Sequence, residues 1–252
     1  MSRLYAVAAA ALLLLMERAA QSAPVNLWME KANAAYEQGT FDTARVYYEK
    51  IIAAGTNSSD VYYNLGNACF RLKQIGPAVL AYEKAKALSP NDPDIIANLK
   101  FANLNTVDKM PQPERSFISA AAWRLHTLVS LETQLWVLLA MLCLLAGMIS
   151  WAFFASHNVR LWLIYGSALL GSVTALAGFS AGAKIWQAEN IRYAIVLAPA
   201  VDAKSEPNGS KVLFSAHEGA KLRVVKDLDA WSFVSLPNGS AGWVENSALG
   251  RI

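Results

Sequence analysis

The sequence is poor in the side chains that perform most enzyme and metal chemistry. It has two cysteines and three histidines in 252 residues. Cys69 lies in a predicted repeat helix and Cys143 in a long apolar run, so a disulfide or a shared metal site is not expected. His126, His157 and His217 fall in three different parts of the chain. The sequence has no glycine-rich phosphate loop, nucleophile elbow or paired-carboxylate motif, so we expect neither an enzyme nor a bound cofactor.

Charge is scarce as well, and neither sign dominates. Charged side chains make up 16% of the chain, with 22 basic and 19 acidic residues. The basic residues form no stripe that could follow a phosphate backbone, so nucleic acid is a poor candidate partner. The hydrophobic content of 55% is explained largely by the N-terminus and two long apolar runs, and does not require an unusually large soluble core.

The two apolar runs, Thr133 to Ala155 and Leu161 to Ala183, organise the chain. Each exceeds the roughly 20 residues that a helix needs to cross a bilayer. We predict transmembrane helices at residues 131–155 and 161–185. The polar patch between them, Ser156 to Arg160, is so short that the helices must be antiparallel neighbours. Both flanking parts of the chain are therefore expected on the same side of the membrane.

Small residues follow the second run, and Gly178 and Gly182 have a small-xxx-small spacing. Small side chains let two helix backbones approach closely in a membrane. The pattern fits packing within the hairpin or against an outside helix, and we favour packing within the hairpin.

Residues 1–23 have the features of a secretory signal peptide. Arg3 supplies a positive start, Tyr5 to Met16 is an apolar core too short to span a membrane, and small residues follow. Because Gln21 stands where cleavage after Ala23 favours a small residue, a retained anchor is the alternative. Export would place the next residues outside the cytoplasm, and the hairpin would return the C-terminal part to the same side.

From Val25 to Asp92 the sequence repeats with a period of 34 residues. Aromatic and small residues recur in both copies at matching positions: Trp28 and Tyr62, Ala32 and Gly66, Tyr36 and Phe70, Ala44 and Ala78, Tyr48 and Tyr82. The small residues allow two helices to approach closely, while the aromatics fill the gaps between layers. The pattern resembles the tetratricopeptide repeat, which implies a short right-handed stack of helix pairs.

The predicted all-α domain covers residues 24–105, with repeats at 25–58 and 59–92 and a capping helix at 94–105. A repeat cannot bury its apolar face alone, so the stack needs a cap. Asp92, followed by proline, is suited to start that last helix.

In the tetratricopeptide family the first helix of each repeat lines a concave groove that binds an extended or helical peptide. The matching positions here are Met29, Glu30, Asn33, Tyr36, Glu37, Tyr63, Asn64, Asn67, Phe70 and Arg71. The asparagines Asn33 and Asn67 resemble those of a tetratricopeptide subclass that clamps the C-terminal carboxylate of a partner protein. That subclass also needs cations where this chain has Met29, Ala97 and Phe101, so we reject the clamp and keep a peptide groove.

Residues 106–130 are expected to form a linker and then an interfacial helix. Pro111 and Pro113 mark the linker. The apolar side chains between Ser116 and Val129 recur at helical spacing, which indicates a helix lying at the membrane surface. The alternative is a simple extension of the first membrane helix.

The C-terminal part consists of short β-type runs divided by turn residues. We predict five strands, at Tyr193–Leu197, Lys211–Phe214, Ala220–Val225, Trp231–Ser235 and Gly242–Val244. The order from His217 to Leu249 resembles the bacterial SH3-like domain, which implies an all-β barrel over residues 191–252. In that family aromatic rings contact peptides or cell-wall material, so Trp231 and Trp243 are candidate contact residues. The loop Ala198 to Ser210 is the expected variable surface.

The whole order of signal, repeats, hairpin and SH3-like domain resembles the BatE-type proteins of bacterial aerotolerance clusters. That resemblance implies partners among membrane-bound von Willebrand factor A domain proteins, beside a MoxR-type ATPase. We therefore expect a multidomain two-pass protein of the bacterial inner membrane, with both soluble domains on the periplasmic side. The expected function is a non-enzymatic scaffold. The alternative is an envelope module that binds peptidoglycan through the SH3-like domain.

Overall fold

The structure is a computed structural model that describes residues 24–109 and 116–252. The predicted signal peptide, residues 1–23, lies outside the described residues. The chain divides into two compact units. One joins the N-terminal helices to the C-terminal strands, Tyr193–Ile252, and the other contains the long apolar helices between Gln112 and Arg192.

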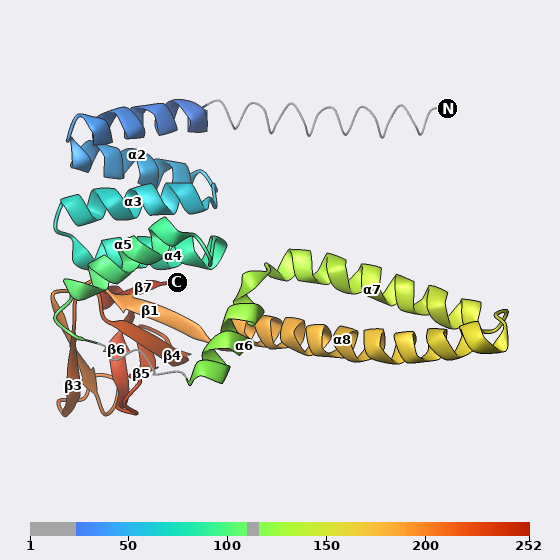
Figure 1. Ribbon diagram of the computed structural model, residues 1–252. Coiled ribbons are helices and arrows are strands. Elements are labelled where there is room, and N and C mark those ends of the chain that lie inside the picture. The colour runs from blue at the N-terminus through green and yellow to red at the C-terminus, as the bar shows by residue number, and fades with distance from the viewer. Residues whose placement is uncertain (1–23, 110–115) are drawn as a thin grey trace, which may run out of the picture. The chain divides into compact units, whose positions relative to one another are not determined.

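The first unit begins with a stack of helices whose neighbours in sequence lie side by side (Figure 1). After a first helix with described residues 24–37, the helices are α2 (Phe41–Ala53), α3 (Ser59–Arg71), α4 (Ile75–Leu88) and α5 (Pro93–Leu104). Asp92 caps α5, because its Oδ1 accepts the backbone N–H groups of Asp94 (2.9 Å) and Ile95 (3.3 Å). The expected capping helix is therefore present, and it begins at Pro93.

The spacing of apolar residues explains how these helices pack. A Cβ at Gly66 would lie 2.6 Å from Cε1 of Tyr82, so only glycine lets α3 and α4 approach this closely. Buried residues of α5 lie 34 positions after apolar residues of α3, namely Ile95 after Val61, Leu99 after Leu65 and Ala102 after Ala68. The 34-residue period thus continues into α5, which is equivalent to the first helix of a third repeat.

The C-terminal strands form one antiparallel sheet. They are β1 (Arg192–Val196), β2 (Ala200–Lys204), β3 (Val212–His217), β4 (Lys221–Leu228), β5 (Trp231–Ser235), β6 (Ala241–Glu245) and β7 (Leu249–Arg251), with a 3₁₀ turn at Asn246–Ala248. Their order is β3-β2-β6-β5-β4-β1-β7, so the sheet is open, with β3 and β7 at its ends. Apolar side chains from most of its strands, among them Val196, Leu222, Val234 and Val244, form its core.

Two strands were missing from the sequence prediction. β2 lies inside Ala198–Ser210, which we expected to be a loop, and it pairs with β3 from Ala200↔His217 to Lys204↔Val212. The short β7 pairs with β1. Both were missed because strands of 5 and 3 residues with charged members carry a weak alternating pattern.

The helices and the sheet share one hydrophobic core. Ile195 of β1 is fully buried in the cluster that contains Val79 and Tyr82 of α4 and Leu99 of α5. A Cβ at Gly76 would lie 2.7 Å from the carbonyl oxygen of Val196, so the start of α4 presses directly on the end of β1. The two soluble parts that the sequence analysis separated therefore fold as a single unit.

Polar contacts complete this junction. The side chain of Gln74 does not cap α4, but Glu218 Oε1 accepts the N–H of Gly76 at 2.8 Å. A carboxylate at this position satisfies a free N–H group and complements the helix dipole. Lys221 pairs with Glu83 (2.7 Å). Asp108, in the segment predicted as a linker, accepts the N–H of His217 (2.7 Å) and lies 3.0 Å from its Nδ1.

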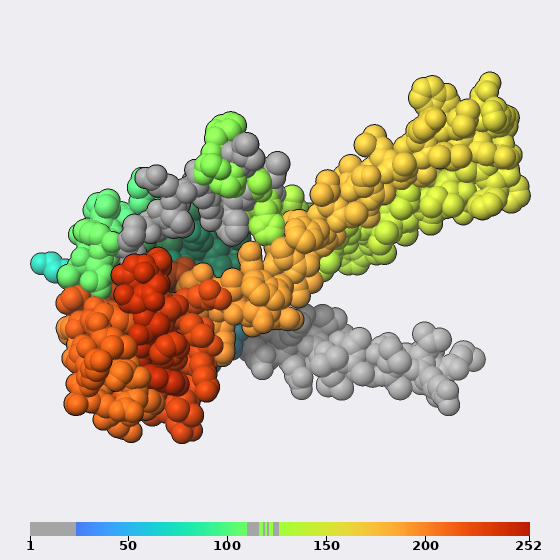
Figure 2. Space-filling view, turned by 90° about the horizontal axis from the view of Figure 1, so that it is seen from below, coloured from blue at the N-terminus to red at the C-terminus, as the bar shows by residue number. Residues whose placement is uncertain are grey.

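The second unit consists of α6 (Phe117–Leu128), α7 (Leu131–Ala152) and α8 (His157–Asn190). Ser130 caps α7 by accepting the N–H of Thr133 (3.2 Å), so α6 is a separate helix and not an extension of α7. By length and composition, α7 and α8 are both able to cross a membrane. Figure 2 shows them side by side along the hairpin, α7 in yellow-green and α8 in yellow to orange.

The hairpin turn differs from the prediction. α7 ends at Ala152 and α8 begins at His157, so the turn occupies residues 153–156 and the rest of the polar patch forms the first turn of α8. Ser156 adopts the extended conformation of an N-cap (φ −61°, ψ 159°). The side chain of Arg160 reaches back to the carbonyl oxygen of Ala152 (3.0 Å). The turn therefore begins three residues and ends four residues earlier than predicted.

The face of α8 that meets α7 also differs from the prediction. Thr174 and Ala181 are buried there, seven residues apart as in a coiled coil. A Cβ at Gly171, Gly178 or Gly182 would meet nothing within 4 Å. The small-xxx-small pair therefore has no close neighbour within the hairpin, contrary to the packing we favoured for it, whereas a Cβ at the small residue Gly166 would lie 2.9 Å from Cε of Met148 in α7.

We predict that the shared core stabilises the repeat helices. Replacing Ile195 with alanine should lower the free energy of unfolding of the full chain by roughly 2–5 kcal/mol, as expected for a large buried aliphatic side chain. Hydrogen exchange of α4 and α5 should also accelerate. Val212→Ala, at an exposed position of β3, is the matched control. Unchanged exchange in α4 and α5 would contradict the shared core.

Candidate functional site

The candidate groove is built on a pair of side chains that recurs in both repeats. The hydroxyl of Tyr48 donates to Oδ1 of Asn33 at 2.7 Å, and the hydroxyl of Tyr82 donates to Oδ1 of Asn67 at 2.7 Å. Both asparagines lie on the first helix of a repeat and both tyrosines on the second. Each tyrosine is almost fully buried and therefore has a fixed position, so its hydroxyl group fixes the orientation of the asparagine side chain.

This arrangement leaves one end of each asparagine amide available. Among the described residues, Nδ2 of Asn33 and Nδ2 of Asn67 donate no hydrogen bond, and neither atom is a buried polar atom without a partner. An asparagine amide has two N–H donors in addition to its acceptor. The buried tyrosines thus fix the acceptor side of two asparagines and leave their donor sides for a ligand.

The third helix of the groove, α5, adds residues that the sequence analysis did not select. Asn98 Nδ2 donates to Oδ1 of Asn67 (2.9 Å) and to the hydroxyl of Tyr63 (3.0 Å). The ring of Phe101 lies 5.4 Å from that of Phe70. Leu104 lies 34 positions after Phe70 and is exposed. Extending the 34-residue period by one more helix would have identified all three residues.

The other predicted groove residues are accessible, but they differ in exposure and in their contacts with other side chains. Met29, Tyr36, Tyr63, Asn64 and Phe70 are half-buried, whereas Glu30 and Glu37 are exposed. The guanidinium of Arg71 lies 4.4 Å from the centre of the Phe41 ring, and that ring contacts Tyr36. Arg71 is therefore partly engaged in joining the two repeats.

The family comparison agrees with this geometry. Residues 29–93 match the tetratricopeptide repeat. The match covers both copies of the 34-residue unit almost completely, and it includes all the predicted groove residues. No curated protein matches the chain. The tetratricopeptide repeat supports a role in protein–protein interaction.

The tetratricopeptide core also contains titratable groups that are held in their neutral forms. Burial, together with the nearby Tyr36 and Glu37, raises the pKa of Tyr48 to about 12. Burial also raises the pKa of Tyr82. Protonated phenols are hydrogen-bond donors, which is the role both tyrosines have toward the asparagines.

Cys69 belongs to the same core and is not suited to act as a nucleophile. Its thiol is buried, and burial raises its pKa to about 12. A thiol reacts only as the thiolate, so Cys69 serves in packing at neutral pH. Within residues 24–109 and 116–252, no group of three or more His, Cys, Asp or Glu side chains could hold a metal ion.

The two tryptophans that we assigned to a contact surface lie in different environments. Trp231 is only 7% exposed, and Lys204 lies over its ring. It therefore offers almost no surface to a partner, which corrects its assignment. Trp243 is half-buried and contacts Phe233, with ring centres 5.3 Å apart. Trp243 and Phe233 form one accessible aromatic pair on the sheet, and Tyr193 of β1 is exposed as well.

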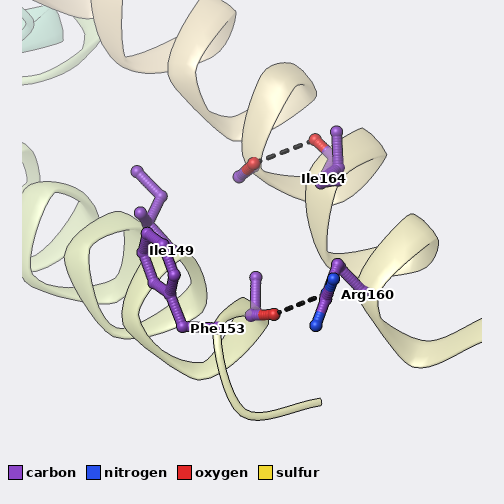
Figure 3. Close-up of a pocket in the computed structure, with 6 residues that line it drawn as sticks. Ile149, Phe153, Arg160 and Ile164 are labelled. Carbon is purple, nitrogen blue, oxygen red and sulfur yellow. Dashed lines mark hydrogen bonds between the residues drawn. The ribbon is translucent and has the colours of Figure 1, made fainter. Parts of the chain in front are cut away.

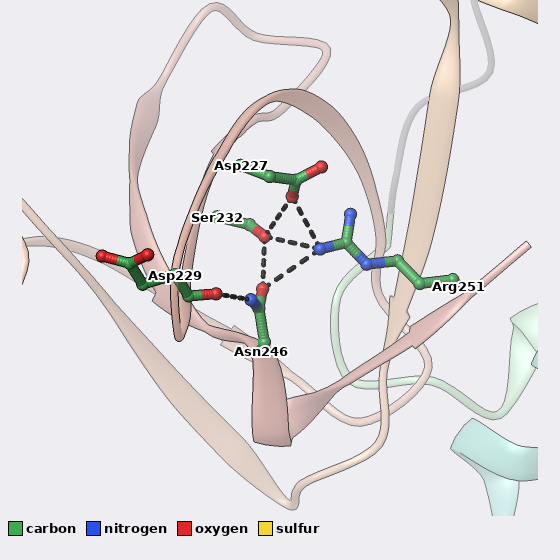
Figure 4. Close-up of polar contacts among 5 residues, drawn as sticks. All are labelled: Asp227, Asp229, Ser232, Asn246 and Arg251. Carbon is green, nitrogen blue, oxygen red and sulfur yellow. Dashed lines mark hydrogen bonds and ion pairs between the residues drawn. The ribbon is translucent and has the colours of Figure 1, made fainter.

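A polar network holds the end of the chain onto the sheet (Figure 4). The buried hydroxyl of Ser232 donates to Asp227 (2.8 Å) and is also hydrogen-bonded to Asn246. Arg251 donates to Asp227 (2.7 Å), to Ser232 (2.7 Å) and to Asn246 (3.1 Å). Because the carboxylate and the guanidinium satisfy each other, the network has a structural role in joining β4, β5 and β7.

One cavity lies at the turn of the hairpin (Figure 3). Its volume is about 330 Å³, and it is lined by Ile149, Ala152, Phe153, Arg160, Ile164 and Ser167. Its cation, Arg160, donates to the carbonyl oxygens of Ala152 (3.0 Å) and Ala155 (3.4 Å). The bond to Ala152 satisfies the last carbonyl group of α7 and the bond to Ala155 holds the turn, so Arg160 acts here as a helix cap.

We predict that Cys69 is unreactive in the folded chain at pH 9. An unfolded thiol with the ordinary pKa of 9.0 is half ionised there, whereas a pKa of about 12 leaves roughly one thiolate in a thousand. Alkylation by iodoacetamide should accelerate about tenfold per pH unit toward pH 12. Since the folded state holds this proton more tightly, rising pH also lowers the Cys69 contribution to the free energy of unfolding.

The measurement is mass spectrometry of the Cys69 peptide in native and denatured protein. A Leu213→Cys variant supplies an exposed control thiol on β3. Equal rates for Cys69 in the two states at pH 9 would show that the thiol is not buried.

Proposed function

We propose that this protein is a non-enzymatic, membrane-anchored adaptor whose tetratricopeptide groove binds a segment of a partner protein. The observation that carries the proposal is the repeated pair in which a buried tyrosine holds an asparagine and leaves its amide N–H groups available. Groups fixed before binding lose little entropy when a ligand arrives. Two such donors on neighbouring helices suit the backbone carbonyl groups of a bound peptide.

The membrane part of the proposal rests on α7 and α8. Their side chains away from the hairpin seam are apolar and exposed, as lipid contact requires. The 34 residues of α8 would extend roughly 51 Å, longer than the ~30 Å hydrocarbon core. We propose that α8 continues beyond the bilayer before it reaches the sheet.

The same-side arrangement is supported by the shared core. Ile195 follows the hairpin in sequence, yet it packs with Val79 and Leu99, which precede the hairpin. Residues on opposite sides of a bilayer could not make this contact. Together with the signal peptide proposed at residues 1–23, this favours a two-pass protein of the bacterial inner membrane whose soluble unit is periplasmic.

The proposed setting is a Bat/MoxR-type aerotolerance complex. The proposed partners are its membrane-bound von Willebrand factor A domain proteins. This rests on the resemblance of the module order to BatE-type proteins, including an SH3-like fold for the open sheet. In such a complex one anchored unit could offer both the groove and the sheet, so that each contact raises the effective concentration of the other.

Binding of peptidoglycan through the SH3-like domain is the weaker proposal. Of the two tryptophans assigned to this contact, only Trp243, which pairs with Phe233, remains accessible, because Trp231 is buried. Sedimentation of the full chain with purified cell wall, compared with Trp243→Ala, tests it. Binding that does not depend on Trp243 would remove this role.

Replacing Asn33 and Asn67 together by aspartate should reduce partner capture about tenfold or more. Aspartate keeps the oxygen that accepts the tyrosine hydroxyl but removes the N–H donors and adds charge to the groove. Asn238→Asp is the matched control, since Asn238 also accepts a hydrogen bond through Oδ1, from the N–H of Ser240 in a sheet turn. The measurement is quantitative pull-down from solubilised membranes, with thermal melting to check the fold. Undiminished capture by the folded double variant would contradict the groove proposal.

The topology proposal predicts that reporters active only outside the cytoplasm work at both ends of the soluble unit. The fusion points are after Asn105, beyond α5, and after Ile252. A fusion within the turn, after Phe154, should be inactive. Activity at one end only would contradict a two-pass hairpin, and activity at neither end would contradict export.

A further inference from the structure

We infer that the groove recognises a partner segment with two features: an apolar anchor, aromatic or leucine, and a basic residue about six positions away in an extended chain. This rests on the proposed function of the groove and specifies the chemistry of its ligand. The groove has an apolar end at α5, an acidic end on the first helix, and one amide donor each on the first helix and on α3.

The apolar end consists of Phe70, Phe101 and Leu104. Phe101 is 57% exposed and Leu104 is 62% exposed, although both lie on a helix whose opposite face is packed. The contact between the Phe70 and Phe101 rings makes a fixed platform beside Leu104. An apolar side chain of a ligand would bury these groups from water, and such anchors supply most of the energy of an interface.

The acidic end consists of Glu30 and Glu37. Both are exposed, and among the described residues neither is in an ion pair. One 34-residue period further along, Glu37 corresponds to Arg71, whose charge is engaged with the Phe41 ring. Among the groove positions of the described residues, unpaired carboxylates occur on the first helix alone, so a cation of the ligand should bind at that end.

The separation of the two ends sets the spacing in the ligand. The first helix, α3 and α5 are neighbours: Ala35 and Val61 share one core, and Asn98 bonds to Asn67. Packed helices lie 8–10 Å apart, so the two outer helices are roughly 20 Å apart. An extended chain advances about 3.3 Å per residue and covers that distance in about six residues. Asn67, on α3, lies between the two ends, and Asn33 lies on the first helix between Glu30 and Glu37, so the N–H groups of both can meet the ligand backbone.

The test uses fluorescent synthetic peptides and the purified full chain in detergent. The first probe has phenylalanine, a Gly-Ser spacer and two lysines about six residues further on. The second replaces the lysines by glutamates, and the third shortens the spacer to two residues. We expect the first probe to bind about tenfold more tightly than either of the others.

Two sets of variants test which end of the groove binds which part of the peptide. Leu104→Ser should weaken the first probe about tenfold, while Leu213→Ser, at an exposed position of β3, should not change it. Glu30→Gln with Glu37→Gln should remove the preference for lysine over glutamate. Equal binding of the lysine and glutamate probes, or an unchanged affinity in Leu104→Ser, would overturn the inference.

Failure of this inference is distinguishable from failure of the proposed function. If Asn33→Asp with Asn67→Asp abolishes partner capture but no probe binds, the groove binds ligands of another chemistry and only the inference is wrong. If capture is unaffected and no probe binds, the groove proposal fails as well.

Discussion

The burial of Ile195 among helices α4 and α5 is the contact on which the rest of the soluble unit depends. A helical repeat exposes an apolar face at its end, and an unprotected face of this kind is unstable in water. Here the sheet covers part of that face. Glu218 of the sheet region also caps the N-terminus of α4, which the preceding residue Gln74 does not cap. The sheet is therefore part of the tetratricopeptide fold as well as a module with its own core.

The groove has its own requirement, which is a rigid support for polar groups. Tyr48 and Tyr82 supply it, because burial keeps both phenols protonated and each donates to an asparagine on the groove. The asparagines need no further partner from the protein to hold their orientation. In the proposed groove, the residues around the amides include Phe101 and Leu104 of α5, both of which are exposed.

Periodic features could be predicted from the sequence, and contacts between distant segments could not. The 34-residue period predicts the helix pairs, and the small residue Gly66 lets α3 and α4 approach closely, as expected. Asp92 caps the start of α5, as predicted. The bond from Gly76 to Glu218, across 142 positions, has no local signature, so the junction was missed. The turn of the hairpin was misplaced because Arg160 caps α7 through a contact that composition does not reveal.

The central claim is that residues on the two sides of the hairpin fold together in one compartment. Glu83 and Lys221 test it most directly, because their side chains are in contact at 2.7 Å across the junction. With Glu83→Cys and Lys221→Cys in one chain, a membrane-impermeant cross-linker applied to intact spheroplasts should join the two positions and change the mobility of the protein. Glu83→Cys with Leu213→Cys, on the outer strand β3, serves as the control pair. Cross-linking at neither stage would contradict the central claim, and cross-linking only after lysis would contradict the periplasmic placement.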